Sequence, residues 1–382
     1  MSYLAPLLHG GAWYLGIFLV VLTVLVFVHE LGHYLIARRN GVRIEVFSIG
    51  FGPELFGWND RAGTRWKFSA IPLGGYVKMF GDSDASSALP AAGLAEMTPA
   101  ERAVSFHYKR LGQRAAIVAG GPLANFAFAI VVLAALFATH GQPFTPAEVG
   151  QVLAGSAAEQ AGVKVGDTIV EINGRTIGRF EDVQQIVRLN RGEPIEMKVR
   201  RDGQVVTLRA TPKLKSMPDR FGNVHEFGQL GIGRSSVEYL KRNPAMAVVQ
   251  AVSETWNLST STLEAMWQII IGVRPSDELG GPIAIGKMAG EVAEGGIVPL
   301  LWFMAVLSIN LGLINLFPVP VLDGGHLLFY AAEAIRGKPL GQRAQEYGFR
   351  IGLALVLTLM VFATWNDLVH LRIVEFVKGL VT

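Results

Sequence analysis

The stretch Val24-Leu-Val-Phe-Val-His29-Glu30-Leu-Gly-His33-Tyr-Leu-Ile-Ala37 sets an H-E-x-x-H motif inside an apolar run. On a helix, residues four positions apart share one face, so both imidazoles can reach a single metal ion. Ionisable side chains inside a bilayer are costly to bury, which makes a chance occurrence of the motif a poor explanation. The stretch therefore predicts a membrane-spanning helix that carries a metal site.

Glu30 lies beside the two histidines, where its carboxylate can take a proton from a water molecule held by the metal. Zinc lowers the pKa of such a water toward neutrality and so produces a nucleophile at ordinary pH. The chain has no cysteine, so the metal ligands must be His, Asp or Glu. We predict His29 and His33 as metal ligands and Glu30 as a general base.

A third protein ligand is required, because catalytic zinc sites use three and leave one position open. The soluble metzincin pattern would place a histidine at position 39, where this chain has Arg39. In the third apolar run and the turn after it, the only acid is Asp323, within Asn315-Leu-Phe-Pro-Val-Pro-Val-Leu-Asp-Gly-Gly-His326. The prolines interrupt the helix, and interrupted backbone at membrane depth is tolerated where it lines a wet cavity. We predict Asp323 as the third ligand; a helix-capping aspartate at the membrane edge is the alternative.

Other polar side chains near these runs have two readings. His326 is a second candidate for the third ligand, although a structural hydrogen bond suits a turn histidine better. Asn310 and Asn315 of the third run either bond the backbone of a substrate or join helices to one another. Asn125, just after Gly120-Gly-Pro-Leu-Ala124, has the same two readings, and the packing role is favoured.

The composition supports a membrane setting. Of the 382 residues, 51% are apolar and 17% are charged, against roughly 25% charged in an ordinary soluble domain. Apolar runs cover residues 13–37, 115–139, 298–322 and 351–371. Each is long enough to cross the hydrocarbon core, which needs about 20 helical residues. The net charge of +3 is small for this length, and we expect no nucleic-acid partner.

Basic residues predict how the runs are oriented. One group lies between the first and second runs, and another lies between the third and fourth. The positive-inside rule places both connections in the cytoplasm. Both termini and the 140–297 segment then face the other side of the membrane. The residues concerned are Arg38, Arg39, Arg43, Lys109, Arg110, Arg114, Arg336, Lys338, Arg343 and Arg350.

The chain divides into an N-terminal membrane half, residues 1–139, an extracytoplasmic part, and a C-terminal membrane half, residues 298–382. Within the first half, residues 42–81 alternate apolar and polar side chains between glycines, which predicts strands. Residues 235–297 predict an amphipathic, extracytoplasmic helical region.

Residues 147–213 predict a small α/β domain inserted between the membrane halves. A short helix is followed by a strand that ends in an Asn173-Gly174 turn. Two further strands are joined by a hairpin at Asp202-Gly203. The stretch Gly228-Gln-Leu-Gly-Ile232 is either the last strand of this domain, which would extend it to residue 234, or a remnant of something more.

Taken together, these residues resemble the site-2 protease family of intramembrane zinc metalloproteases (M50), and within it the bacterial RseP (regulator of sigma-E protease) branch. The likeness rests on the H-E-x-x-H motif, on Gly121-Pro-Leu-Ala-Asn125 in the second run and on the Asn315–His326 stretch. It also includes a PDZ-like domain inserted between the second and third runs, so it covers nearly the whole chain. Better-known enteric members carry two tandem PDZ domains, whereas one is found here.

The resemblance implies that His29, His33 and Asp323 bind Zn²⁺ and that Glu30 is the general base. It also implies that the Asn310–Asn315 stretch helps to hold the substrate strand. Residues 42–81 resemble the family's membrane-re-entrant β element, which offers an edge to an unwound substrate. Adding the freed segment to a sheet edge compensates the hydrogen bonds that the substrate helix loses.

We therefore expect a polytopic α-helical protein of a bacterial inner membrane, with about four spans, a membrane-re-entrant β element and an inserted PDZ-like α/β domain. The PDZ-like domain and both termini are expected in the periplasm, and the metal site near the cytoplasmic side. The expected function is an intramembrane zinc endopeptidase that cleaves single-span membrane proteins, such as an anti-sigma factor after a first cut, or remnant signal peptides. Its expected partners are transmembrane substrates, the bilayer and a peptide ligand of the PDZ-like domain.

Two other functions compete with this expectation. A noncatalytic scaffold that recruits partners through its PDZ-like domain would have no use for Glu30. A zinc transporter would need further histidines or acids along the second and fourth spans, where the first such residues are His140, Asp367 and His370.

Overall fold

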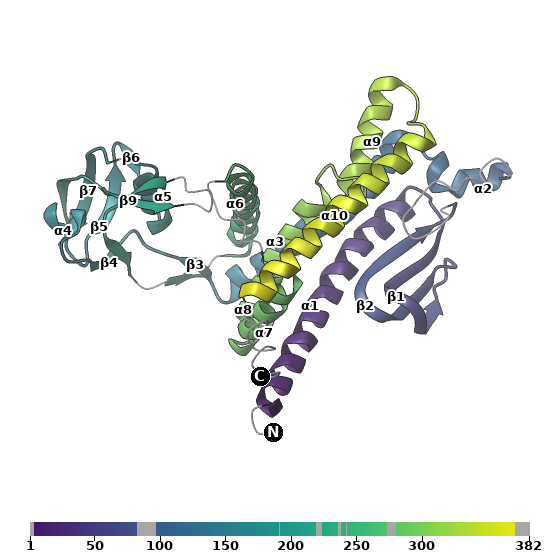
Figure 1. The fold of residues 1–382 in the computed structure, drawn as a ribbon, viewed down its shortest axis with the longest axis horizontal. Helices are drawn as coiled ribbons and strands as arrows, with labels where there is room; N and C mark the ends of the chain where they lie inside the picture. Colours follow the sequence, from purple (N-terminus) through teal and green to yellow (C-terminus); the bar gives the residue numbers. More distant parts are fainter. Residues whose placement is uncertain are drawn as a thin grey trace. The chain divides into compact units, whose positions relative to one another are not determined.

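In a computed structural model, the chain forms two compact units (Figure 1). The first combines residues 1–134 with 248–262 and 277–382, and the second contains residues 135–247 and 263–276. The first unit is thus interrupted in sequence by the second. The structure describes residues 4–81, 97–190, 192–218, 224–235, 238–241, 243–272 and 280–370.

Four helices in the described part of the chain are long and apolar enough to cross a bilayer, which supports the predicted polytopic helical fold. Three of them extend beyond the predicted apolar runs, because helical hydrogen bonding continues into the polar flanks. The spanning segments lie within α1 (Leu4–Arg39), α3 (Leu111–Thr139), α8 (Ile297–Asn315) and α10 (Gln342–His370).

The third helix ends earlier than the apolar run, which continues to residue 322. The α8 helix stops at Asn315, and α9 (Asp323–Arg336) begins eight residues later in the sequence. Pro318 and Pro320 have no N–H to donate and cannot continue the helix. Between the helices, Leu322 donates its N–H to the Val319 carbonyl at 2.8 Å, which closes a tight turn. Asp323 is therefore the first residue of a new helix, directly after an irregular segment.

The predicted strands at residues 42–81 form an antiparallel sheet of β1 (Ile44–Asn59) and β2 (Arg65–Met79). Both strands bend, so that Phe47 pairs with Trp66 on one side and with Val77 on the other. Each of the two strands thus supplies two segments to the sheet. The segment at Gly75–Met79 is an outer one, and no other strand in the described residues pairs with its second edge.

Glycines allow these bends, and apolar side chains lie beyond them. Gly50 has φ of +91°, and a Cβ there would lie 2.8 Å from the Ile71 carbonyl oxygen, so another residue would be strained. At this end of the sheet, Leu55 is 68% exposed and Phe56 is 57% exposed. An exposed apolar end suits contact with lipid. The membrane-re-entrant character of the element stays a prediction.

A close crossing of two helices fixes the centre of the first unit. A Cβ at Gly32 of α1 would lie 2.6 Å from the Ala124 side chain of α3, and a Cβ at Gly120 would lie 2.8 Å from the Gly32 carbonyl oxygen. Small residues let helix backbones approach this closely in a membrane. The crossing brings the H-E-x-x-H turn of α1 against the middle of α3.

A buried carboxylate in α10 joins two further helices. Asp367 is 4% exposed and accepts backbone N–H bonds from Gly281, Ile283 and Ala284 at 2.8–3.1 Å. These N–H groups belong to the first turn of α7 (Pro282–Glu294) and lack partners within that helix. Asp367 is thus a helix cap, which accounts for the acid that the transporter reading had considered. The structure also describes α2 (Pro99–Val104), η2 (Phe106–Tyr108) and α6 (Pro244–Ile270).

The second unit contains a small α/β domain with the turns predicted from its sequence. Its four-stranded sheet has the order β6-β5-β7-β8. Asn173 and Asp202, each followed by glycine, have φ of +47° and +49°, as tight hairpin turns require. The elements are β4 (Val149–Val152), α4 (Ala157–Gln160), β5 (Thr168–Ile172), β6 (Arg175–Thr176), α5 (Phe180–Leu189), β7 (Ile195–Arg201) and β8 (Gln204–Ala210).

Later strands of this unit reach back to its beginning. Leu230 is buried in the domain core, and β11 (Ile232–Arg234) pairs antiparallel with β4. The 228–232 stretch therefore leads into a strand of this domain, which was one of its two readings. The other strands are β3 (Gln142–Phe144), β9 (Lys213–Pro218), β10 (Val224–Gln229) and β12 (Glu238–Leu240).

One buried ion pair holds the α/β domain. Asp167 has a side chain only 1% exposed, and Arg201 donates to both of its carboxylate oxygens at 2.7 Å. Burial alone would raise the pKa of Asp167, but the Arg201 guanidinium and the Lys164 N–H outweigh it and hold the pKa below its ordinary value. Asp167 thus contributes stability at neutral pH.

We expect Arg201→Gln to destabilise the domain by about 3 kcal/mol near pH 7, because a buried carboxylate loses its counter-charge. In the wild type, the contribution of Asp167 is present above the ordinary carboxyl pKa of about 3.9. It is lost as the pH falls through the lower pKa of the folded state. Hydrogen exchange of β5 and β7 in the purified full-length chain measures both effects.

Arg209→Gln is the matched control. Its pair with Glu196 spans 3.4 Å between side chains that are 80% and 47% exposed, so its loss should cost less than about 0.5 kcal/mol. If β5 and β7 were equally protected from hydrogen exchange in the two variants, the role assigned to Asp167 would be contradicted.

Candidate active site

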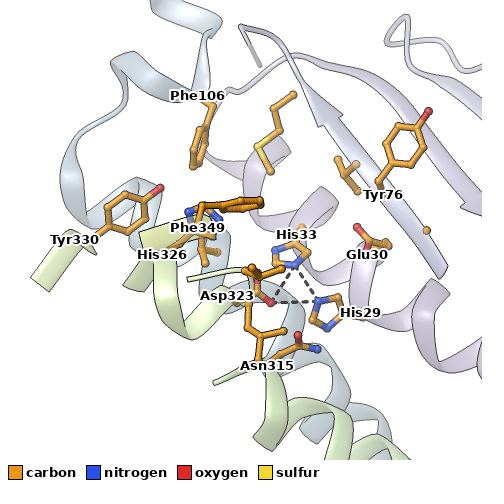
Figure 2. A pocket seen from close by; sticks show the side chains of 16 residues that line it. His29, Glu30, His33, Tyr76, Phe106, Asn315, Asp323, His326, Tyr330 and Phe349 are labelled. Atoms are coloured by element: carbon orange, nitrogen blue, oxygen red, sulfur yellow. Dashed lines mark hydrogen bonds and ion pairs between the residues drawn. The ribbon is translucent and has the colours of Figure 1, made fainter. Parts of the chain in front are cut away.

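A cavity of about 260 Å³ lies where α1, the outer edge of β2 and the turn between α8 and α9 meet. His29, Glu30, His33, Asn315 and Asp323 all line it (Figure 2). Residues from the N-terminal and the C-terminal parts of the sequence thus line the same cavity. Asn310, the remaining predicted site residue, is not among the residues that line it.

The three predicted ligands converge on a single point. Asp323 Oδ2 lies 3.2 Å from His29 Nε2 and 3.5 Å from His33 Nε2. The two Nε2 atoms lie 3.2 Å apart. Figure 2 shows the carboxylate facing both rings, with the two histidines presented from successive turns of α1. Among the described residues, His29, His33 and Asp323 are thus spaced closely enough to hold one metal ion.

These side chains fit a divalent cation with tetrahedral ligands. Zinc binds imidazole nitrogen and carboxylate oxygen at about 2.0–2.2 Å, so two ligands of a tetrahedron lie about 3.4 Å apart. The three observed separations cluster around that value. Asp323 Oδ2 is also buried without a hydrogen-bond partner, a costly arrangement that a cation would relieve. His326 lines the cavity but lies outside this close group.

Local backbone geometry delivers Asp323 to this point. A Cβ on Gly324 would collide with the Leu316 carbonyl oxygen, and one on Gly325 would collide with the Val319 carbonyl oxygen. Only glycine lets the start of α9 pack so closely on the preceding turn. The two glycines after the acid therefore allow the tight reversal.

The α3 helix orients both histidine rings from behind. His33 Nδ1 lies 2.9 Å from the Ile117 carbonyl oxygen, to which it can donate. His29 Nδ1 lies 3.1 Å from Asn125 Nδ2. Turning this amide by 180° would instead let its oxygen, which is buried without a partner, accept from an Nδ1–H of His29. Such bonds leave Nε2 of each ring as the free donor atom for a metal.

Asn125 was expected to serve packing, and its contact with His29 shows that this reading was incomplete. The residue is fully buried, and its own carbonyl accepts a hydrogen bond from Ser308 at 2.9 Å. The position of Asn125 within an apolar run was the available sequence signal. Its partner was not visible in the sequence, because the two residues belong to different helices.

Glu30 occupies the side of the cavity next to the sheet. A Cβ at Gly75 of β2 would lie 3.2 Å from Glu30 Cγ, so a larger residue there would crowd the acid. Figure 2 shows the carboxylate between the histidines and the strand that carries Tyr76. This places a proton acceptor beside both the ligand group and the open strand edge.

The two asparagines of α8 have different surroundings. Asn315, the last residue of that helix, lines the cavity. Asn310 accepts a hydrogen bond from the Thr262 hydroxyl of α6 at 3.2 Å. Asn310 thus has the helix-joining contact that was one of its two readings, and Asn315 has the position suited to a bound peptide.

Comparison with known proteins finds metalloproteases that match nearly the whole chain. The model of "Peptidase family M50" matches residues 17–359. A protein of Rhizobium meliloti (strain 1021) named "Putative zinc metalloprotease" is 48% identical over 355 residues, which cover 92% of this chain and 95% of the relative. "Metalloprotease MmpA" of Caulobacter vibrioides is 40% identical over 387 residues, covering 95% and 97%. The names of these relatives and the ligand chemistry together identify zinc as the metal.

We expect Gly121→Ala to weaken zinc binding by at least about tenfold, the lower end of effects measured for residues behind metal ligands. An added Cβ would collide with His33 Nε2 and lie 2.8 Å from His29 Cε1, so the rings must move. Competition with a chelator, followed by metal analysis of the protein, measures the loss.

Gly112→Ala in the same helix is the control, because nothing lies within 4 Å of a Cβ at that position. It should retain zinc as the wild type does. Equal zinc retention by the two variants would show that the rings do not require the close approach of α3.

Proposed function

Because this chain belongs to peptidase family M50, the site-2 protease family, we propose that it is an intramembrane zinc endopeptidase that cuts single-span membrane proteins. The supporting observation is the convergence of His29, His33 and Asp323 beside Glu30, in a cavity of the unit that contains the candidate spans. A noncatalytic scaffold would gain nothing from this arrangement.

We assign His29, His33 and Asp323 as the residues that hold the metal. Zinc held by these residues would polarise a peptide carbonyl and lower the pKa of a water molecule, so that the deprotonated water could attack that carbonyl. The carboxylate of Glu30 takes the proton from the attacking water and then gives it to the departing amine nitrogen. The Ile117 carbonyl, and the Asn125 amide with its oxygen turned toward His29, would keep both imidazoles in the required tautomer.

Asn315 is the residue best placed to hold the substrate backbone. It lines the same cavity as Glu30, and its side-chain amide offers both a donor and an acceptor. The donor suits the carbonyl next to the cut, and the acceptor suits a substrate N–H. Asn310 would act indirectly, by holding α8 through its bond with Thr262.

The open edge of β2 accounts for how a helical substrate could be cut. Peptide bonds within a helix are shielded by their own hydrogen bonds, so cleavage requires local unwinding. No other strand in the described residues pairs with the second edge of the Gly75–Val77 segment, which borders the cavity. A substrate segment that pairs with this edge regains hydrogen bonds and is laid beside Glu30.

We assign the inserted α/β domain as PDZ-like and place the chain in the RseP branch. The pairing of β11 with β4 and the packing of a single long helix, α5, on the sheet support that assignment. The corresponding substrates are a membrane-bound anti-sigma factor after a first cut, and remnant signal peptides. A peptide terminus is the ligand class for the domain. The surrounding lipid bilayer is the second partner.

Glu30→Gln should reduce cleavage of a tagged single-span substrate by about 10²–10⁴-fold, the usual contribution of a general base. Bound zinc should stay at the wild-type level, because Glu30 is outside the ligand group. Asp323→Asn should instead lower bound zinc together with cleavage. Both quantities are measured on the purified full-length chain.

Glu346→Gln, an exposed change in α10, controls for the loss of one negative charge. Cleavage by Glu30→Gln at the rate of this control would remove Glu30 from the reaction and reopen the scaffold reading. Full zinc retention by Asp323→Asn would remove Asp323 from the ligand set.

The predicted orientation puts the α/β domain in the periplasm and the α9–α10 connection in the cytoplasm. Single cysteines at Glu181 and Ala344, both exposed, test it in a chain that has no cysteine of its own. A thiol reagent that does not cross the inner membrane should label Glu181→Cys in cells and should label Ala344→Cys only after lysis. The reverse pattern would invert the topology.

A further inference from the structure

An ion pair links the helix that carries Asp323 to the helix that orients the two histidines. Arg114 Nη2 of α3 lies 2.5 Å from Glu333 Oε1 of α9. The side chains are 16% and 17% exposed, so water screens the pair weakly. By contrast, the Arg350–Glu346 pair has side chains 70% and 57% exposed and lies within the single helix α10.

The same guanidinium makes a second contact with α9. The Arg114 Cζ atom lies 5.0 Å from the centre of the Tyr330 ring, within the range of a cation–π interaction. Tyr330 and Glu333 are three positions apart and therefore share one face of α9. Arg114 thus holds that face of the helix through a charge and through an aromatic ring. Tyr330 also lines the site cavity.

The position of α3 makes this contact relevant to the metal ligands. Starting from Arg114 in its first turn, α3 next presents the Ile117 carbonyl to His33 and then the Asn125 amide to His29. One helix therefore touches both histidines and, through Arg114, the helix that begins at Asp323. The α3 helix therefore supports all three ligands.

The α9 helix needs support from α3, because the irregular turn before α9 does not by itself fix the direction of the helix. Asp323 and Glu333 are ten residues apart, about 15 Å along a helix. A tilt of a few degrees about the far end would move the Asp323 carboxylate by more than the roughly 0.2 Å that a zinc site tolerates. Partly buried Leu327 and Tyr330 pack against the apolar core, but apolar contacts are not directional.

We propose that Arg114 and Glu333 are positioning residues that hold α9 against α3 and so keep Asp323 in register with His29 and His33. This inference rests on the proposed metal site. It assigns the pair no contact with the substrate and no part in proton transfer.

The test is zinc retention by the purified full-length chain during competition with a chelator. Arg114→Gln and Glu333→Gln should each lose half their zinc at about tenfold lower chelator concentration than the wild type. The double variant should lose no more than Arg114→Gln alone, because Glu333 acts through Arg114. Glu346→Gln, which breaks the exposed pair of α10, should behave as the wild type.

A second readout separates positioning from a general loss of stability. The protein loaded with Co²⁺ in place of zinc should show a shifted visible absorption band in Glu333→Gln, since that band reports ligand geometry. Glu346→Gln should show the wild-type band. The melting temperature of the metal-free proteins serves as the measure of folding alone.

The outcomes are distinguishable. A wild-type chain that binds no zinc would defeat the proposed function itself. A wild type that binds zinc while Glu333→Gln matches Glu346→Gln in both readouts would overturn the positioning role alone. Losses that multiply in the double variant would also overturn it, because the two residues would then act independently.

Discussion

The arrangement of the first unit depends on holding three electron-pair donors within about 3.5 Å of one another. Two imidazole nitrogens and one carboxylate oxygen face a shared point, and that oxygen is buried without a hydrogen-bond partner. Such groups repel or are left unsatisfied unless a cation lies between them, and a weakly solvated interior increases both costs. Rigid neighbours must therefore keep the donors in place, and the rest of the site can be understood as meeting that need.

The α3 helix meets most of it, although it supplies no ligand. Its glycines let it approach α1 closely. Its Ile117 carbonyl and Asn125 amide lie within hydrogen-bond distance of the Nδ1 atoms of the two histidines. Its first turn holds α9 through Arg114. A ligand set drawn from distant parts of a chain needs a shared support of this kind, because each ligand is otherwise positioned by a different helix.

The cavity combines this metal chemistry with an open strand edge. Glu30 is packed beside Gly75, so the proposed proton acceptor and the proposed substrate edge are neighbours. The exposed apolar end of the same sheet lies beyond its glycine bends. One element therefore has exposed apolar side chains at one end and a strand edge beside Glu30 at the other, and the proposed unwinding of a membrane helix would use both.

The sequence alone determined the features that depend on local pattern. The H-E-x-x-H spacing, the apolar runs, the proline break before Asp323 and the Asn-Gly and Asp-Gly turns each follow from short-range geometry and solvation. The tertiary structure decided which of several polar residues meet: Asn125 with His29, Asn310 with Thr262, and Arg114 with Glu333. Such pairings depend on how helices cross and rotate against one another, and that is set by packing over the whole unit rather than by any one stretch of chain.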